Sequence, residues 1–247
     1  MLSRPHKQPA FQHVYVTTLL LSTCCLLQFS PLTSAEETKK DDVINVVYFA
    51  PEDSRWMFSR KRAGPAIDFA INKVSKTLLP GRRIRTHFAD SKCDSKSAPL
   101  AAFEWSTKNA SVFLGPVCDY SIAPVARYAP HWNIPVVTPG AMAHNFGTGN
   151  EFPRLTRVGA TFNDIALQMH ILLVKYNWSK LAILYDSDAL NHITENYCYL
   201  MISALGWYFK AVVQPPLDLR QEQIRPEDGP RGYEKLLKED VGILKSS

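Results

Sequence analysis

Apolar positions in the first part of the chain switch repeatedly between a period of two and a period of 3.6 residues. The first period is typical of strands and the second of amphipathic helices. Such alternation predicts right-handed crossovers and a largely parallel sheet covered by helices on both faces. The predicted strands are residues 44–49, 83–89, 111–114 and 134–137, and the predicted helices between them are residues 63–74, 98–105 and 121–129.

The sharpest change of pattern lies where the third of these strands ends. The apolar run Val112–Leu114 stops at Gly115-Pro116, and the loop then delivers Cys118 and Tyr120 ahead of the next helical pattern. This strand–loop–helix corner points backbone N–H groups away from the carboxyl end of a strand. Open α/β sheets bind ligands at that edge, and helix N-termini favour anions.

A second α/β lobe is predicted after a Gly-, Ala-, His- and Asn-rich stretch over residues 138–151. We expect a first lobe of four strands over residues 43–155 and a second lobe over residues 156–247. The second is expected to be incomplete, because a parallel sheet that stops within a strand leaves a bare edge. Its predicted elements are a helix over 162–176, a strand over 180–185, a helix over 189–208, a strand over 210–213, a loop over 214–229, a helix over 233–238 and the start of a strand over 241–244.

Length and composition are those of a globular protein. With 247 residues and 46% apolar composition, the chain can bury a sizeable core. Its net charge of +5 falls to +3 without the first 35 residues, because Arg4 and Lys7 are the only basic residues there and no acidic residue accompanies them. So small a surplus argues against nucleic-acid binding. We interpret the basic clusters at residues 60–62 and 82–83 as a solvated face and a turn.

Residues 1–35 have the organisation of a secretory signal peptide. A positive region around Arg4 and Lys7 precedes an apolar stretch over residues 14–27 and small residues at 33–35. The alternative is a signal anchor that stays in the membrane, but threonine and serine residues interrupt the apolar stretch. We therefore expect the chain to enter the secretory pathway, which is an oxidising environment.

The cysteines and glycosylation motifs agree with this route. Without residues 1–35 the chain holds Cys93, Cys118 and Cys198. Cys93 and Cys118 both follow predicted strands, so we predict a disulfide between them, worth about 3 kcal/mol, with Cys198 left without a partner. Asn109-Ala-Ser111 and Asn177-Trp-Ser179 are acceptors for N-linked glycans at predicted helix-to-strand turns.

No enzyme motif is present in the sequence. His-Glu-x-x-His, Gly-x-Ser-x-Gly and Cys-x-x-Cys are absent, and Gly147-Thr-Gly149 lacks the preceding strand that a phosphate-binding loop requires. We predict neither a catalytic residue nor a metal site.

Several motifs, taken together and in order, closely resemble the extracellular ligand-binding region of the natriuretic peptide receptors. The resemblance runs from about Asn45 to the C-terminus. It implies a type I periplasmic-binding-like fold of two lobes, a homodimer, and a cyclised peptide hormone bound between the membrane-proximal lobes. The motifs are Arg62-Ala-Gly-Pro-Ala-Ile67, Leu79-Pro-Gly81, Phe113-Leu-Gly-Pro-Val-Cys118, Ala123-Pro-Val-Ala-Arg127, His131-Trp132-Asn-Ile-Pro135 and Leu155-Thr-Arg-Val158.

The resemblance also implies a chloride ion beside the first disulfide, held by the hydroxyl of Ser91 and the amides of Val117 and Cys118. The residues themselves are compatible with this site, since a disulfide at Cys93 draws Ser91 toward amides at a helix start. The alternative is that Ser91 only caps a turn.

Peptide-contact and dimer-contact positions follow from the same resemblance, each beside a structural alternative. The alternative for Tyr120 is packing on its helix, and the alternative for Arg127 is a solvated charge on the helix. Tyr185 can equally end a strand, and the tryptophans can pack in the core or at its rim. Leu200 replaces an aromatic residue that family members often have. The implied peptide contacts are Asp94, Tyr120, Arg127, Tyr185 and Tyr199, and the implied dimer contacts are Trp105, His131 and Trp132.

The sequence also departs from the family pattern. The cysteine that pairs in the family with the equivalent of Cys198 is replaced near Lys245, so the second disulfide cannot form. The family's later segments, including its membrane helix, have no counterpart in the sequence. We therefore predict an extracellular or cell-surface hormone-binding receptor region, truncated before the membrane helix. Two alternatives are a secreted small-molecule binder of the same fold and a non-binding chain that pairs with full-length receptor.

Overall fold

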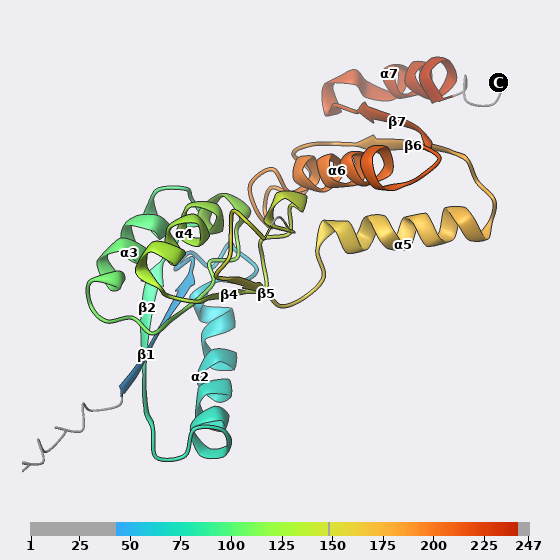
Figure 1. Ribbon diagram of the computed structural model, residues 1–247. Coiled ribbons are helices and arrows are strands. Elements are labelled where there is room, and N and C mark those ends of the chain that lie inside the picture. Colours follow the sequence, from blue (N-terminus) through green and yellow to red (C-terminus); the bar gives the residue numbers. More distant parts are fainter. Residues whose placement is uncertain (1–42, 148, 242–247) are drawn as a thin grey trace, which may run out of the picture. The chain divides into compact units, whose positions relative to one another are not determined.

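The computed structural model describes residues 43–147 and 149–241 (Figure 1), so the predicted signal peptide and residues 242–244 of the last predicted strand lie outside the described residues. Its larger sheet has five parallel strands in the order β2-β1-β3-β4-β5. The strands are β1 (Val43–Ala50), β2 (Arg83–Asp90), β3 (Val112–Leu114), β4 (Val136–Thr138) and β5 (Leu155–Arg157).

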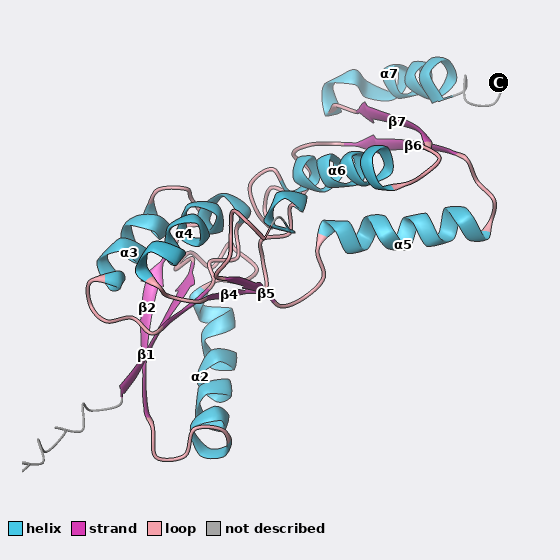
Figure 2. Ribbon diagram, in the orientation of Figure 1, coloured by secondary structure: helices cyan, strands magenta, loops and turns pink. Residues whose placement is uncertain are grey.

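Helices cover both faces of this sheet. Figures 1 and 2 show α2 (Arg60–Thr77) on one face and α3 (Ser97–Ser106) with α4 (Asp119–Trp132) on the other. Right-handed crossovers explain this arrangement, because the chain steps from β1 to β2 in one direction and from β2 through β3 to β4 in the other. The predicted α/β class with a parallel sheet between helices is confirmed.

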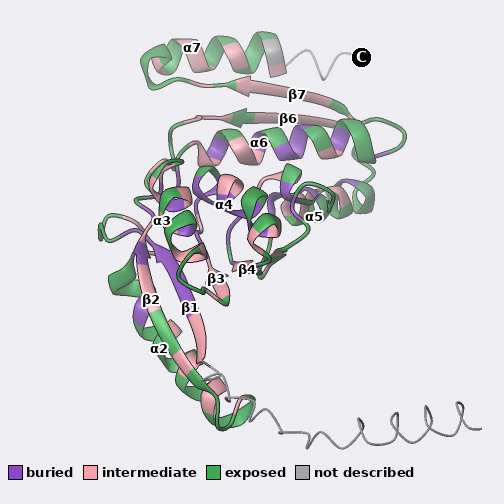
Figure 3. Ribbon diagram, turned by 60° about the vertical axis from the view of Figure 1, so that its left-hand side comes forward, coloured by how far each residue is buried: buried purple, intermediate pink, exposed green. Residues whose placement is uncertain are grey.

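The main core lies between the sheet and α3 and α4 (Figure 3). Val47, Phe113 and Val136 come from three neighbouring strands and are completely buried. Small residues on the helices, such as Ala98 and Ala126, let the backbones approach the sheet closely. By contrast, α2 buries only Gly64 among its residues, so its face of the sheet is much less densely packed.

A second, two-stranded parallel sheet pairs β6 (Lys180–Tyr185) with β7 (Asp218–Gln223). Its core contains Ala166, Leu173, Ile202, Leu205, Phe209 and Val213. The remaining elements are η1 (His144–Gly147), α5 (Phe162–Lys175), α6 (Tyr197–Trp207), η2 (Tyr208–Val212), η3 (Pro226–Asp228), α7 (Gly229–Leu236) and η4 (Leu237–Val241).

The first sheet has five strands where four were predicted. β5 pairs with β4 in the register Val136↔Leu155 and Thr138↔Arg157. Three residues are too few for a period-two pattern to stand out, and backbone pairing with β4 is what makes this segment a strand.

Two predictions for the second sheet region were wrong. Residues 210–213 are not a strand, because η2 continues α6 as a helical turn that buries Phe209, and Val213 directly after it also lies in the second core. The strand lies instead at β7, within the predicted loop. β7 is mostly polar, and α6 covers it through Gln221, whose Nε2 donates to the Ile202 carbonyl at 2.9 Å.

The start of α6 also differs from the prediction. The helix begins at Tyr197 rather than near residue 189, after a turn in which Asn196 has a φ of 55°. Left-handed backbone there ends the turn and starts the helix. Within the described ranges, no helix combines the length and the apolar character needed to cross a membrane.

Candidate ligand-binding site

The carboxyl ends of the parallel strands meet at one edge of the first sheet, and a disulfide joins two loops there. Cys93 follows β2 and Cys118 precedes α4; their Cα atoms are 5.5 Å apart, and both side chains are buried. The predicted pairing is confirmed. Cys198 is buried and forms no disulfide among the described residues.

The loop before Cys118 is held between two backbone segments. Gly115 has a φ of 81°, and a Cβ on it would lie 2.6 Å from the Phe49 carbonyl oxygen at the end of β1. On the other side, a Cβ on Gly140 would lie 1.9 Å from the Val117 carbonyl oxygen. Only glycine allows such close approaches, so both positions fix the path of the loop.

A buried threonine completes this support. Thr138 Oγ1 donates to the Pro116 carbonyl at 2.7 Å and accepts from the Gly140 amide at 3.0 Å. Its hydroxyl therefore uses both its donor and its acceptor capacity to join the loop after β3 to the loop after β4. The Gly115-Pro116 peptide bond is cis.

The three groups expected to bind chloride belong to the two loops that the disulfide joins. Ser91 is completely buried, and its Oγ accepts from the Cys93 amide at 3.4 Å. Among the described residues, neither the Val117 amide nor the Cys118 amide donates a hydrogen bond. Both amides lie directly before the first turn of α4, a helix of 14 residues. Three donors next to a helix N-terminus suit a small anion.

Asp119 holds the loop after β4 against the start of α4. Its buried carboxylate accepts from the Ala143 amide at 2.9 Å, while Arg157 donates to the Ala141 carbonyl at 3.2 Å. Burial raises the pKa of Asp119, and the hydrogen bonds from the backbone amides of Ala143 and Met142 oppose that rise only in part.

Two predicted peptide-contact residues line one cavity of about 220 Å³ beside α4. Tyr120 accepts a hydrogen bond from the Asn196 side chain at 3.3 Å. The Arg127 guanidinium binds the Glu151 carboxylate, with Nε 2.9 Å from Oε1, and lies 5.5 Å from the centre of the Phe152 ring. Leu200 contributes an apolar wall. The site thus offers a phenol, an ion pair and apolar surface.

Glu151 and Phe152 were not predicted as site residues. Glu151 ends the stretch over residues 138–151 that was interpreted as the boundary between lobes, and Phe152 follows it directly. A carboxylate and an aromatic residue within an otherwise small, polar stretch were the available signal, but no periodicity accompanied them.

Asp94 is used mainly to begin α3. Its Oδ1 accepts from the amides of Lys96 and Ser97 at 2.8 and 2.6 Å, and its Oδ2 accepts from the Ser97 hydroxyl at 3.0 Å. Burial alone would raise the pKa of Asp94, but the amide hydrogen bonds from Ser97 and Lys96 outweigh it and lower the pKa. Its carbonyl also accepts from the Ser121 hydroxyl at 2.8 Å, which joins this turn to α4.

The other two predicted peptide contacts lie in the second sheet region. Tyr185 ends β6 and packs partly against the second core, and Tyr199 is exposed on α6. Neither lines the cavity formed by Tyr120 and Arg127.

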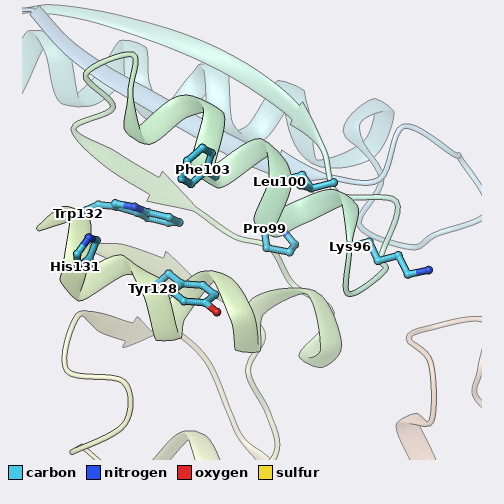
Figure 4. Close-up of a pocket in the computed structure, with 7 residues that line it drawn as sticks. All are labelled: Lys96, Pro99, Leu100, Phe103, Tyr128, His131 and Trp132. Atoms are coloured by element: carbon cyan, nitrogen blue, oxygen red, sulfur yellow. The ribbon is translucent and has the colours of Figure 1, made fainter.

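A large apolar hollow of about 650 Å³ lies between α3 and α4 (Figure 4). We call it the α3–α4 patch. Phe103 is 62% exposed, and its ring centre lies 6.4 Å from that of Trp132, which also contacts Tyr128. The lining residues are Lys96, Pro99, Leu100, Phe103, Tyr128, His131 and Trp132.

Two of the three predicted dimer contacts, His131 and Trp132, line this patch, whereas Trp105 does not. The Trp105 ring packs against the His87 ring in a tilted arrangement, with centres 4.4 Å apart, and Lys108 Nζ lies 5.3 Å from the centre of the Trp105 ring. Trp105 therefore packs over β2, away from the patch.

Comparison with known proteins identifies the class. Residues 62–240 match the family described as the receptor family ligand binding region. Together with the parallel sheet and the site at its carboxyl edge, this shows that the chain belongs to that family of receptor ligand-binding regions.

Similar proteins within this class include natriuretic peptide receptors. The chain is 33% identical over 177 residues to atrial natriuretic peptide receptor 3 of Rattus norvegicus, an alignment covering 68% of this chain and 32% of that receptor. The Homo sapiens protein of the same name is 32% identical over 177 residues, with the same two shares. Atrial natriuretic peptide receptor 2 of Rattus norvegicus is 34% identical over 130 residues, 52% of this chain and 12% of the receptor. The chain thus spans about a third of the length of its type 3 relatives.

Proposed function

We propose that this chain is an extracellular ligand-binding region of a natriuretic-type peptide hormone receptor, reached through the secretory pathway. The observation that carries the proposal is the cavity of Tyr120 and Arg127, set beside a disulfide-fixed loop in a chain of the receptor ligand-binding family. The two-lobe organisation belongs to the same proposal, with the five-stranded and two-stranded sheets as the cores of the two lobes.

The size and chemistry of the cavity favour a peptide over an enclosed small molecule. At about 220 Å³ it is below the usual range of roughly 300–1,000 Å³ for small-molecule sites. It suits a single side chain of a larger ligand instead. Arg127 and Glu151 offer a charge of each sign, and Phe152 and Leu200 offer apolar contact. Peptide surfaces combine these features.

Chloride at Ser91, Val117 and Cys118 is part of the proposal, and the donor set fits it. The buried Ser91 hydroxyl and the two amides can all donate to one anion, and none of the three groups carries a charge of its own. Bound chloride would add a negative charge at the α4 N-terminus, where the helix dipole stabilises it. Its role here is to hold the loop before Cys118 in place.

A homodimer through the α3–α4 patch completes the proposal. Exposed apolar surface of this extent, centred on Trp132 and Phe103, is typical of interaction sites. Phe103→Glu should therefore convert a dimer to a monomer in sedimentation experiments. Phe69→Glu is the matched control, because Phe69 is also largely exposed but lies on α2, across the sheet. A dimer that survives Phe103→Glu excludes this face.

Calorimetric titration tests the ligand class. We expect the secreted full chain to bind a cyclic natriuretic-type peptide and not free amino acids, and Arg127→Ala to weaken peptide binding about tenfold. Binding of amino acids alone would instead indicate a small-molecule binder. Mixing the chain with an intact natriuretic peptide receptor tests pairing, and association without peptide binding would favour the pairing alternative.

A further inference from the structure

Two aromatic rings stand exposed at the C-terminal end of α5. Tyr176 is 54% exposed and Trp178 is 59% exposed, and their rings stack with centres 5.1 Å apart and planes inclined by 26°. Rings of this size contribute much of the energy of a contact when covered and leave apolar surface in water when not. Their surroundings in the structure indicate what covers them.

Asn177 lies between these residues in the sequence, in a turn that suits asparagine. Its φ is 54°, its amide donates to the Val174 carbonyl at 3.1 Å, and the Trp178 amide donates to the Leu173 carbonyl at 2.8 Å. This pair of bonds is the Schellman ending of a helix, with asparagine at its left-handed position. Asn177 and Ser179 of the glycan acceptor are both exposed.

A groove of about 250 Å³ begins at the same turn. Asn177 and Trp178 line it together with Pro215 and Pro216. Its walls mix polar and apolar groups, including His170. This mixture suits a sugar, whose ring has an apolar face bounded by hydroxyl and acetamido groups.

We propose that Asn177 carries an N-linked glycan whose first sugar packs on the Tyr176–Trp178 ring pair, at the mouth of this groove. The glycan is the occupant because it is attached covalently to Asn177, which lies between the two exposed aromatic residues in the sequence. It shields surface that would otherwise be a site for association. The inference rests on the proposed function only through passage along the secretory pathway.

The acceptor at Asn109 provides an internal comparison. It too is exposed and left-handed, with a φ of 57°. Its neighbours in sequence are Lys108 and Ala110, and Trp105 nearby is already covered by His87 and Lys108. A glycan on Asn109 therefore has no exposed ring pair to pack against, and its removal is expected to change little.

The test uses the full chain secreted from glycosylating cells. Glycopeptide mass spectrometry measures occupancy at both asparagines, and thermal unfolding is compared before and after enzymatic deglycosylation under native conditions. We expect Asn177→Gln to lower Tm by roughly 3 °C and Asn109→Gln to leave it nearly unchanged. In Trp178→Ala, loss of the Asn177 glycan should cause no further fall in Tm. In Trp178→Phe, loss of the glycan should still lower Tm by most of the amount seen in the parent chain.

A structural readout separates stacking from other effects of the glycan. Ring currents should shift the first sugar's proton resonances upfield in the glycosylated parent chain and in glycosylated Trp178→Phe, but not in glycosylated Trp178→Ala. Glycan on Asn109 without glycan on Asn177 overturns the inference and leaves the receptor proposal standing. Absence of glycan at both sites of the secreted chain also overturns the inference, and it leaves the secretory route standing because that chain has passed along it. If removal of the Asn177 glycan lowers Tm equally in the parent chain and in Trp178→Ala, the proposed stacking is wrong.

Discussion

Arg127 on α4 and Glu151, 24 residues later, form an ion pair in which both Nε and Nη2 bind the same carboxylate oxygen. Each side chain is about half exposed, so water screens the attraction. We expect Arg127→Lys to change the free energy of unfolding in urea by less than about 1 kcal/mol but to weaken peptide binding, because a lysine lacks the planar fork.

The double variant Arg127→Glu with Glu151→Arg is the matched control for this pair. It restores the ion pair in reverse, so stability should return to that of the parent chain while peptide binding does not. Recovery of binding would show that the pair acts only as a structural contact.

Chloride should stabilise the chain through Ser91. A ligand that binds only the folded state raises stability with its concentration, so Tm should rise as sodium chloride replaces sodium gluconate at constant ionic strength. Ser91→Ala removes one of three donors and should reduce that rise while the fold is retained. Bromide-soaked crystals with no anomalous peak near Ser91 would contradict the site.

Reduction of the Cys93–Cys118 disulfide should cost about 3 kcal/mol of stability, since it frees a loop of 25 residues in the unfolded chain. Urea unfolding of Cys93→Ser with Cys118→Ser measures this cost. Cys198→Ala is the control, because that thiol forms no bridge. Equal stability of the parent and the double variant would indicate that the loop is held by its backbone contacts alone.

Gly140→Ala should destabilise the chain by about 2 kcal/mol or more and reduce its response to chloride. A Cβ there would overlap the Val117 carbonyl, so the backbone beside the anion site has to move. Gly149→Ala is the matched control, because a Cβ on Gly149 has no described atom within 4 Å. Chemical denaturation of both variants tests the expectation, which fails if they are equally stable.

Stability should depend on Asp164 at neutral pH and not in strong acid. Its Oδ2 accepts from the Thr161 hydroxyl at 2.7 Å and from the Thr161 amide at 2.6 Å, and these bonds lower the pKa of Asp164. A lowered pKa in the folded state means that the stabilisation is present above the unfolded value of about 3.9 and is lost as pH falls through the folded value.

The variant Asp164→Ala tests this helix cap. It should lose about 1 kcal/mol at pH 7, and the difference from the parent chain should shrink as the pH falls below about 3.9. Urea unfolding at several pH values measures the difference. A gap that persists unchanged in strong acid would rule out the carboxylate as its source.

Local pattern was sufficient for much of the first sheet region. The apolar runs of β1 and β3, the alternation of β2 and the helical spacing of α4 are properties of neighbouring residues, so the sequence by itself determined these elements. The pairing of Cys93 with Cys118 followed as well, because the carboxyl ends of parallel strands in one sheet lie at one edge, even though β1 separates β2 from β3.

What only the tertiary structure decided depends on distant partners. β5 and the polar β7 are strands because β4 and β6 offer them backbone hydrogen bonds, which no local periodicity records. Trp105 and Trp132 both lie near the C-terminal end of a helix, yet one packs on His87 and the other lines the α3–α4 patch. Glu151 joined the site only because the loop after β4 returns to α4 and places its carboxylate within reach of Arg127. Such contacts are set by the path of the folded backbone, and side-chain pattern along the chain cannot specify them.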